Sequence, residues 1–285
     1  MSADVAELTV AIGDYPFARA LKSGAGASPL LKLDFAEVTP INRAFAAMVR
    51  ELKYDVSEMA IATFLQAKAL GKELALLPIV TFARFQESAL LCRADSHIRS
   101  PADLKGRRVG VRSYSQTTGL WLRGTLADDY GVAADSIDWV TFEDAHVAEC
   151  RDPPFARRAK PGEVLLTMLR DGALDAAIFG ADVPNDPAFR RVFADLDASA
   201  QAFLRRYGFT PVNHLVCVRT AVAAAQLDLV VELMRMIKDA AGDADIVRSR
   251  AALDPALDLA SRYAAEQGLI ERRLNPTEIW SDSPV

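Results

Sequence analysis

The sequence predicts a two-lobed α/β protein whose lobes enclose a ligand-binding cleft. Strand-like and helix-like segments alternate along the chain, which is typical of mostly parallel sheets covered by helices. The chain has 285 residues, 51% of them hydrophobic, and this length suits two modest cores better than one large core. Helical patterns dominate the last part of the chain, and we expect these helices to pack back on the first lobe.

The predicted strands are short apolar segments bounded by turn residues. Leu74–Phe82 is an apolar run suited to a strand buried on both faces. Gly13 turns the chain after the first predicted strand. The other predicted strands are Leu8–Ile12, Asp55–Met59, Ala89–Cys92, Arg108–Val111, Ile137–Thr141, Leu174–Phe179 and His214–Arg219.

The predicted helices combine apolar periodicity with capping residues. Phe45, Met48, Val49 and Leu52 recur as one face of a helix over residues 42–53. A one-turn helix is expected to begin at Ser100-Pro101, because Ser is a good cap and Pro suits the first turn. The remaining predicted helices span residues 64–70, 117–130, 163–170, 221–240, 245–252 and 256–267.

Domain boundaries must lie in short crossovers, because the chain has no internal repeat and no long linker. We place the crossovers near residues 84–88 and 205–212. Residues 1–86 and 210–285 are therefore predicted to form the first lobe, and residues 87–209 the second.

Composition and charge exclude several classes of protein. The net charge is −5, so there is no general basic surface for nucleic acid. The chain begins without a basic segment or an apolar run, and we expect a cytoplasmic protein that does not bind membranes. The three cysteines are far apart and are expected to be buried thiols in a reducing compartment rather than disulfides.

Several motifs resemble a known family. Residues 93–111 resemble the opening of the second lobe of type II periplasmic-binding-protein-like proteins. Other motifs are similar to those of the 4,5-dihydroxyphthalate decarboxylase family, and the resemblance covers about residues 8–275. These motifs are Gly13-Asp14-Tyr15, Tyr54-Asp-Val-Ser-Glu-Met59, Trp121-Leu-Arg-Gly124, Asp129-Tyr-Gly-Val132 and Gly208-Phe-Thr-Pro-Val-Asn-His214. The resemblance implies the type II periplasmic-binding-protein-like fold with an interlobe cleft, and a cytoplasmic decarboxylase.

The chain departs from the family pattern at one crossover. In the family, a His-Ser pair follows an Arg-x-Phe motif. Here Arg84-Phe85 is followed by Gln86 and Glu87, so that Glu87 stands in place of the family's His.

Candidate site residues follow from the position of ligands in open α/β sheets, which bind beyond the carboxyl ends of the strands. We expect His214 and Glu58 to be catalytic. Histidine is a common proton donor in catalysis, which makes His214 an acid–base candidate, and Glu58 can move protons if it lies in a cleft. The predicted substrate contacts are Asp14, Arg19, Ser57, Arg84, Tyr114, Ser115, Thr117, Thr118 and Asn213.

Each candidate has a structural alternative. The segment Ser113–Thr118 precedes a helix, and its hydroxyls either bind an anion or simply cap that helix. Glu58 could be a structural acceptor, His214 a core residue, and Arg84 or Arg19 a solvated surface cation. Glu143, His146 and Glu149 have a spacing that could bind a metal in a helix, but without a partner motif we expect no metal.

The leading functional hypothesis is a cofactor-independent decarboxylase of a hydroxylated aromatic dicarboxylate, similar to 4,5-dihydroxyphthalate. A hydroxyl para to the departing carboxylate accepts the electrons, so that no cofactor is needed. A cation and amide groups would hold the second carboxylate. The first alternative is a solute-binding protein for a small carboxylate that performs no chemistry. The second is a biosynthetic enzyme of the same fold, although the cysteine- and histidine-rich segment of the thiamine-precursor type is missing.

Overall fold

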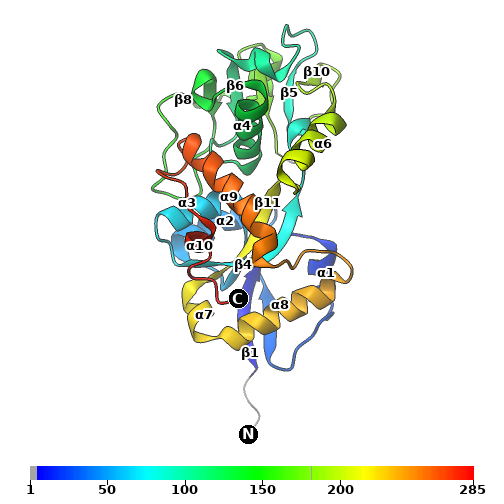
Figure 1. The fold of residues 1–285 in the computed structure, drawn as a ribbon, viewed down its shortest axis with the longest axis vertical. Helices are drawn as coiled ribbons and strands as arrows, with labels where there is room; N and C mark the ends of the chain where they lie inside the picture. The colour runs from blue at the N-terminus through cyan, green and yellow to red at the C-terminus, as the bar shows by residue number, and fades with distance from the viewer. Residues whose placement is uncertain (1–4, 181) are drawn as a thin grey trace. The chain divides into compact units, whose positions relative to one another are not determined.

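Residues 5–180 and 182–285 are described by a computed structural model, in which the chain forms two units that each have a sheet of their own (Figure 1). Unit 1 comprises residues 1–83, 212–258 and 274–285, and unit 2 comprises residues 84–211 and 259–273. The chain therefore passes from one unit to the other at Ala83/Arg84 and Pro211/Val212, close to the predicted crossovers. It does so twice more, at Asp258/Leu259 and Arg273/Leu274.

The last part of the chain differs from the prediction. Residues 259–273, which the sequence assigned to the first lobe, group with unit 2. The reason is helix α9 (Arg250–Glu266), which runs uninterrupted through Pro255. The sequence predicted two shorter helices here, over residues 245–252 and 256–267. Residues 245–249 are not helical, and Val247 instead forms a β-bridge with Ile79.

The sheet of unit 1 has five strands in the order β2-β1-β3-β11-β4. Only β11 is antiparallel to its neighbours. The chain leaves the unit after β4 and re-enters it directly at β11, so the returning strand runs in the opposite direction. The bounds are β1 (Ala6–Ala11), β2 (Leu31–Phe35), β3 (Val56–Ala60), β4 (Leu74–Ala83) and β11 (Val212–Arg219).

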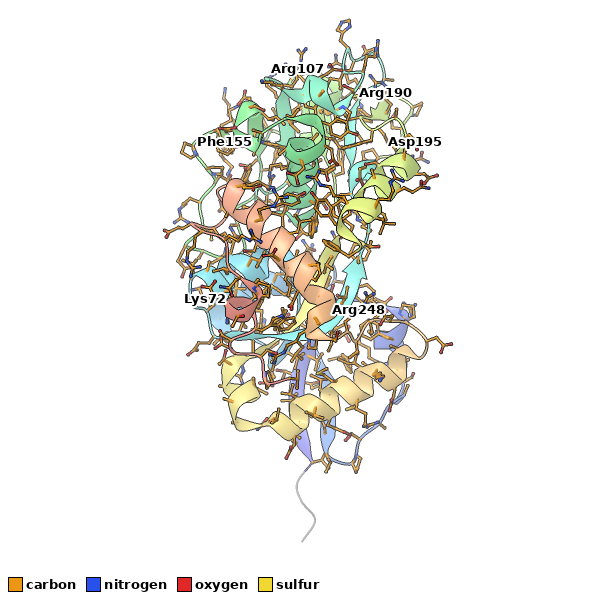
Figure 2. All side chains as sticks on the ribbon, in the orientation of Figure 1. Lys72, Arg107, Phe155, Arg190, Asp195 and Arg248 are labelled. Atoms are coloured by element: carbon orange, nitrogen blue, oxygen red, sulfur yellow. The ribbon has the colours of Figure 1, made fainter. Side chains whose placement is uncertain are left out.

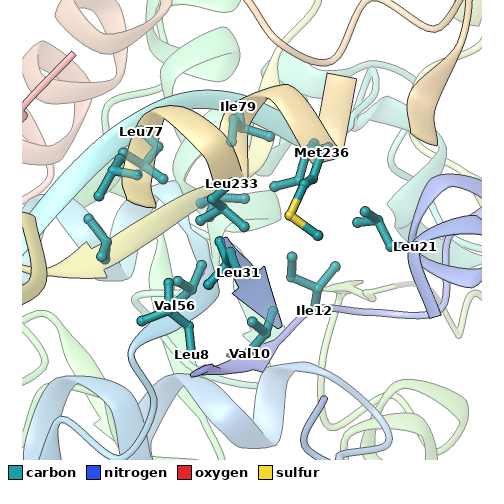
Figure 3. Packing of buried hydrophobic residues seen from close by; sticks show 14 of the residues in the cluster. Leu8, Val10, Ile12, Leu21, Leu31, Val56, Leu77, Ile79, Leu233 and Met236 are labelled. Atoms are coloured by element: carbon teal, nitrogen blue, oxygen red, sulfur yellow. The ribbon is translucent and has the colours of Figure 1, made fainter. Parts of the chain in front are cut away.

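The core of unit 1 lies between this sheet and helices α1 and α8. Leu233 and Met236 of α8 meet Leu8, Val10 and other strand residues (Figure 3). These residues alternate along their strands or recur every three to four positions along the helix, which are the periods of one buried face. The helices of unit 1 are α1 (Pro16–Lys22), α2 (Asn42–Glu51), α3 (Ile61–Ala69), α7 (Thr220–Ala225), α8 (Leu227–Ala241), α10 (Pro276–Ile279) and the start of α9.

The sheet of unit 2 has six strands in the order β10-β5-β9-β6-β7-β8. Strands β9, β6, β7 and β8 are parallel, and β5, which follows the first crossover, is antiparallel to β9. The carboxyl ends of the parallel strands share one edge, as ligand binding in such sheets requires. The bounds are β5 (Leu90–Arg93), β6 (Arg108–Val111), β7 (Asp138–Thr141), β8 (Ala156–Arg158), β9 (Ala176–Ile178) and β10 (Phe189–Arg191).

Three helices and the end of α9 cover this sheet. Helix α4 begins after β6, and its side chain Trp121 packs edge-on against Phe203 of α6 and Tyr263 of α9. Asp195, marked in Figure 2, caps α6 by accepting a hydrogen bond from the N–H of Ala198. The helices are α4 (Thr117–Tyr130), α5 (Leu165–Arg170) and α6 (Leu196–Tyr207), with short 3₁₀ turns at Glu87–Ala89, Pro101–Leu104 and Ala134–Ser136.

Asp128, near the end of α4, joins the three long helices of unit 2. Its carboxylate accepts hydrogen bonds from the hydroxyl of Tyr207 at 2.6 Å, from the hydroxyl of Tyr263 at 2.7 Å and from Nη2 of Arg262 at 2.5 Å. Burial alone would raise the pKa of Asp128, but these hydrogen bonds outweigh it and lower the pKa to about 2. The Asp128 carboxylate therefore stabilises the packing of α6 and α9 on α4.

We expect Asp128→Asn to lower the free energy of unfolding at pH 7 by about 1–3 kcal/mol, because buried hydroxyl donors lose a charged acceptor. The stabilisation by Asp128 is complete above its unfolded pKa of 3.8 and is lost as the pH falls through about 2. The difference between wild type and variant should therefore narrow below pH 4, as measured by urea unfolding.

The neighbouring substitution Asp129→Asn is the control. Asp129 pairs at 2.8 Å with Arg206, which is half exposed, so its loss should change the free energy of unfolding by less than about 1 kcal/mol. Equal losses in the two variants would contradict the role given to Asp128.

Candidate functional site

Glu58 is a fully buried carboxylate at the centre of β3 in unit 1, with 0% of its surface exposed. Its Oε2 accepts a hydrogen bond from the N–H of Gly13 at 2.8 Å. Its Oε1 accepts from the hydroxyl of Tyr15 at 2.7 Å and lies 2.6 Å from Nδ1 of His214. Both carboxylate oxygens are thus used, which is what a buried charge requires.

The geometry of the strands brings these groups together. Glu58 lies on β3 opposite Val216 of β11, while Gly13 and Tyr15 follow the end of β1, the other neighbour of β3. A Cβ atom on Gly13 would lie 2.9 Å from the Tyr15 ring and 3.2 Å from Oε2 of Glu58, so glycine permits the close approach. Burial, followed by the charge of Glu58, raises the pKa of Tyr15 far above its usual value, so its hydroxyl stays a donor.

His214 is oriented by Glu58 and by two aromatic rings. It lies on β11 at an irregularity in the pairing with β4. Phe45 contacts the imidazole edge-on at a centroid distance of 5.2 Å, and Phe82 lies at 5.7 Å. With Nδ1 facing the Glu58 carboxylate, Nε2 forms no hydrogen bond to any residue that the structure describes. The side chain is 19% exposed, so Nε2 is the nitrogen that can exchange a proton with a ligand.

This arrangement refines the roles predicted for the two catalytic candidates. The sequence allowed Glu58 to move protons itself or to accept backbone N–H groups. In the structure Glu58 accepts the Gly13 N–H and also contacts His214, the arrangement in which an acid can fix the tautomer and orientation of a histidine. His214 remains the candidate for proton transfer, and Glu58 is placed to orient it.

The turn Ser113–Thr118 of unit 2 lies between β6 and α4. The side chains of Ser113, Ser115, Thr117 and Thr118 are all buried, with 4–5% exposed. The hydroxyls of Ser113 and Ser115 lie 3.1 Å apart. Gln116 is the N-cap residue of α4, and its side chain forms no capping hydrogen bond.

The start of α4 favours anion binding over simple helix capping as the interpretation of the turn. Simple helix capping would place a Ser or Thr side chain at the N-cap position, and Gln116 stands there instead. The first N–H groups of this 14-residue helix carry the positive end of its dipole. Together with the adjacent hydroxyls, they form a set of donors suited to a carboxylate.

Arg84 and Glu87 occupy the first crossover, within unit 2. Nη2 of Arg84 donates to the carbonyl of Gly180 at 2.9 Å, and burial lowers the pKa of Arg84. Glu87, which replaces the family's His, is buried. Its Oε1 accepts from the hydroxyl of Ser199 at 3.1 Å, and its Oε2 has no hydrogen-bond partner among residues 5–180 and 182–285.

The other predicted contacts lie in varied surroundings. Asp14, with 76% of its side chain exposed, forms an ion pair with Arg19 at 2.9 Å. The hydroxyl of Ser57 donates to the backbone carbonyl of Glu58. Tyr114 is fully buried and its hydroxyl donates to the carbonyl of Gln267 at 3.0 Å, while Asn213 is buried on β11.

The structure does not support the metal alternative. The segment that contains Glu143, His146 and Glu149 is not helical, so the spacing does not place them on one helix face. The described part of the chain contains no group of three or more His, Cys, Asp or Glu side chains that could hold a metal ion.

None of the described helices is long and apolar enough to cross a membrane.

Comparison with known proteins gives the family. A family described as "ABC transporter, phosphonate, periplasmic substrate-binding protein" matches residues 34–152. The 4,5-dihydroxyphthalate decarboxylase of Comamonas testosteroni is 30% identical over 234 residues, which cover 76% of this chain and 69% of the relative. The chain belongs to the 4,5-dihydroxyphthalate decarboxylase family. The enzyme of that name from Pseudomonas putida is also 30% identical, over 183 residues that cover 60% of this chain and 69% of the relative.

Solved structures with the same fold confirm the fold class. The alkanesulfonate-binding protein SsuA from Xanthomonas axonopodis pv. citri aligns with a TM-score of 0.54 and 17% identity, over 99% of this chain and 86% of SsuA. The desulfurization enzyme DSZB aligns with a TM-score of 0.57 and 15% identity, over 96% of this chain and 95% of DSZB. The prediction of a two-lobed fold of the type II periplasmic-binding-protein kind is therefore confirmed, as is the family resemblance.

We expect Glu58→Gln to lower the free energy of unfolding by about 1–3 kcal/mol, because its amide group must face a buried donor at one of the two carboxylate positions. Tyr15→Phe removes a single donor and should cost about 1 kcal/mol. Urea unfolding measures both variants.

Glu51→Gln provides the matched control, since Glu51 lies exposed at the end of α2. Its free energy of unfolding should stay within about 0.5 kcal/mol of wild type. A Glu58→Gln variant as stable as this control would show that the buried hydrogen bonds of Glu58 contribute nothing.

Proposed function

We propose that this protein is a decarboxylase of a hydroxylated aromatic dicarboxylate, with 4,5-dihydroxyphthalate as the first substrate to test. The observation that carries the proposal is the Glu58–His214 pair, in which Nδ1 of His214 lies 2.6 Å from Oε1 of the buried Glu58. Binding of an anion needs no such pair, whereas protonation of a ring carbon needs an oriented acid.

The proposed reaction replaces a carboxylate with a proton. The hydroxyl para to the departing carboxylate loses its proton to solvent, and Nε2 of His214 donates a proton to the ring carbon that bears the carboxylate. This gives a dienone, in which the bond from that carbon to the carboxylate breaks. The electron pair returns to the ring, CO₂ leaves, and the phenolate and the imidazole regain their protons from solvent. The ring stores the electron pair, so the chemistry requires no cofactor.

In the proposed mechanism the turn Ser113–Thr118 of unit 2 binds the carboxylate that stays on the ring. The N–H groups at the start of α4 and the buried hydroxyls of the turn are the proposed donors. Arg84 adds a charge-assisted hydrogen bond. The proposal therefore predicts that variants of His214 and variants of the turn Ser113–Thr118 impair the same reaction.

His214→Ala should reduce turnover of 4,5-dihydroxyphthalate by about 10²–10⁴-fold, the usual effect of removing a general acid. Its affinity for phthalate should stay within a few fold of wild type. Arg84→Ala should instead raise the dissociation constant of phthalate, because a charge-assisted bond is lost. Release of CO₂ and calorimetric titration measure the two effects separately.

Arg206→Ala is the control for Arg84→Ala, because Arg206 also lies in unit 2, is half exposed and is already paired with Asp129. It should leave both turnover and affinity unchanged. Normal turnover by His214→Ala would refute the assignment of the proton donor.

A second candidate function is binding of a small anion without chemistry. The match to the phosphonate-binding family and the uncapped start of α4 favour it. The two candidates differ in one measurement on the wild-type protein. Binding of aromatic carboxylates without release of CO₂ from any of them would establish the binding function.

A further inference from the structure

Arg123 is a buried cation whose hydrogen-bond acceptors are neutral. It lies on α4 with 1% of its surface exposed. Its Nε–H donates to Oε1 of Gln267 at 2.7 Å, and its Nη2 donates to the backbone carbonyl of Tyr114 at 2.7 Å. The guanidinium also lies over the ring of Tyr114, 4.0 Å from its centroid. Its buried Nη1 has no hydrogen-bond partner within residues 5–180 and 182–285.

The acid whose charge acts on Arg123 interacts with other groups. Asp152 is the carboxylate whose charge acts on Arg123. It accepts a hydrogen bond from the hydroxyl of Thr141 at 2.6 Å and lies 3.7 Å from Arg158. No carboxylate in the described part of the chain forms an ion pair with Arg123. A buried charge without an opposite charge is strongly destabilising, so we looked for a function that would explain the buried charge of Arg123.

The position of Arg123 connects it to the turn Ser113–Thr118. The carbonyl of Tyr114, which accepts from Nη2, belongs to the same peptide group as the N–H of Ser115. A cation at the carbonyl end polarises this peptide and strengthens the donor at its other end. The N–H of Ser115 forms no hydrogen bond with the residues that the structure describes.

Arg123 also lies beside the start of α4. Its Nη1 is 2.8 Å from the position that a Cβ atom on Gly119 would occupy, and Gly119 belongs to the first turn of the helix. The positive charge of Arg123 therefore adds to the positive end of the helix dipole. Both act on a group bound at the uncapped N–H groups.

We infer that Arg123 is a positioning residue whose buried charge selects a negatively charged group at the turn Ser113–Thr118, granted the carboxylate-binding role proposed for that turn. The carboxylate of the ligand is the missing counter-ion. Arg123 does not touch the ligand, because its side chain is only 1% exposed. Its charge favours a carboxylate over a neutral group of the same shape.

Gln267 allows the charge to be tested without removing Arg123. Gln267→Glu keeps an acceptor for the Nε–H of Arg123 and adds the opposite charge beside it. Gln267→Met removes that acceptor and leaves the charge of Arg123 uncompensated. Both variants lose the hydrogen bond from Nε2 of Gln267 to the carbonyl of Leu120, so they are matched in this respect.

The probes are phthalate and its neutral diamide, phthalamide, titrated by calorimetry into the wild-type protein and both variants. Gln267→Glu should raise the dissociation constant of phthalate about tenfold, within the range usual for coupling between two sites. The affinity for phthalamide should not change. Gln267→Met should unfold at a lower temperature but should still prefer phthalate to phthalamide as strongly as the wild-type protein.

Two results would overturn the inference. One is a phthalate affinity in Gln267→Glu equal to that of the wild-type protein. The other is a loss of the preference for phthalate in Gln267→Met as large as in Gln267→Glu, since this would mean that packing and not charge is responsible. Release of CO₂ from 4,5-dihydroxyphthalate is measured separately. If Gln267→Glu weakens phthalate binding as expected but the wild-type protein releases no CO₂, the inferred role of Arg123 is supported and the proposed decarboxylase function is refuted.

Discussion

An ionisable side chain buried in each unit must find hydrogen-bond partners, and this requirement shapes the structure around both candidate sites. In unit 1 Glu58 gathers Gly13, Tyr15 and His214 from β1 and β11, the two strands that flank β3. In unit 2 the guanidinium of Arg123 gathers the turn after β6 and the residue that follows α9. Because unpaired buried polar groups are costly, these contacts fix the backbone as firmly as the apolar core does.

Close approach of the backbone accompanies both buried groups. A Cβ atom on Gly124 would lie 2.2 Å from the ring of Tyr263, and one on Gly119 would crowd Nη1 of Arg123. The family motif Trp121-Leu-Arg-Gly124 thus has a physical explanation. Its Trp121 and Gly124 contact Tyr263 of α9, and its Arg123 donates a hydrogen bond to Gln267, the residue that follows α9. This packing also explains why residues 259–273 belong to unit 2 although they follow a segment of unit 1.

Sequence patterns sufficed for elements with a clear signal, such as the continuous apolar run of β4 and the periodic apolar face of α2. They also singled out His214 and Glu58 as catalytic candidates. They did not reveal the bond between these two residues, which are 156 positions apart, because it depends on the pairing of β3 with β11. Helix α6 was missed although Asp195 and Gly208 cap it, since Phe203 is its only buried residue within the described chain. Helix α1 was also missed, because it has only seven residues and no side-chain cap to mark its start.

The turn at α4 and the Glu58–His214 pair differ in the chemistry that each could perform. In the proposed function, the turn at α4 offers a carboxylate the N–H groups at the start of the helix, hydroxyls and the nearby positive charge of Arg123. Nothing in that turn transfers a proton. The Glu58–His214 pair has the opposite character, since a buried carboxylate repels an anionic ligand and is useful only when it orients a proton donor. A protein that merely bound anions would not need a carboxylate at position 58, and the hydrogen-bonded Glu58–His214 pair is therefore the observation that supports the proposed chemistry.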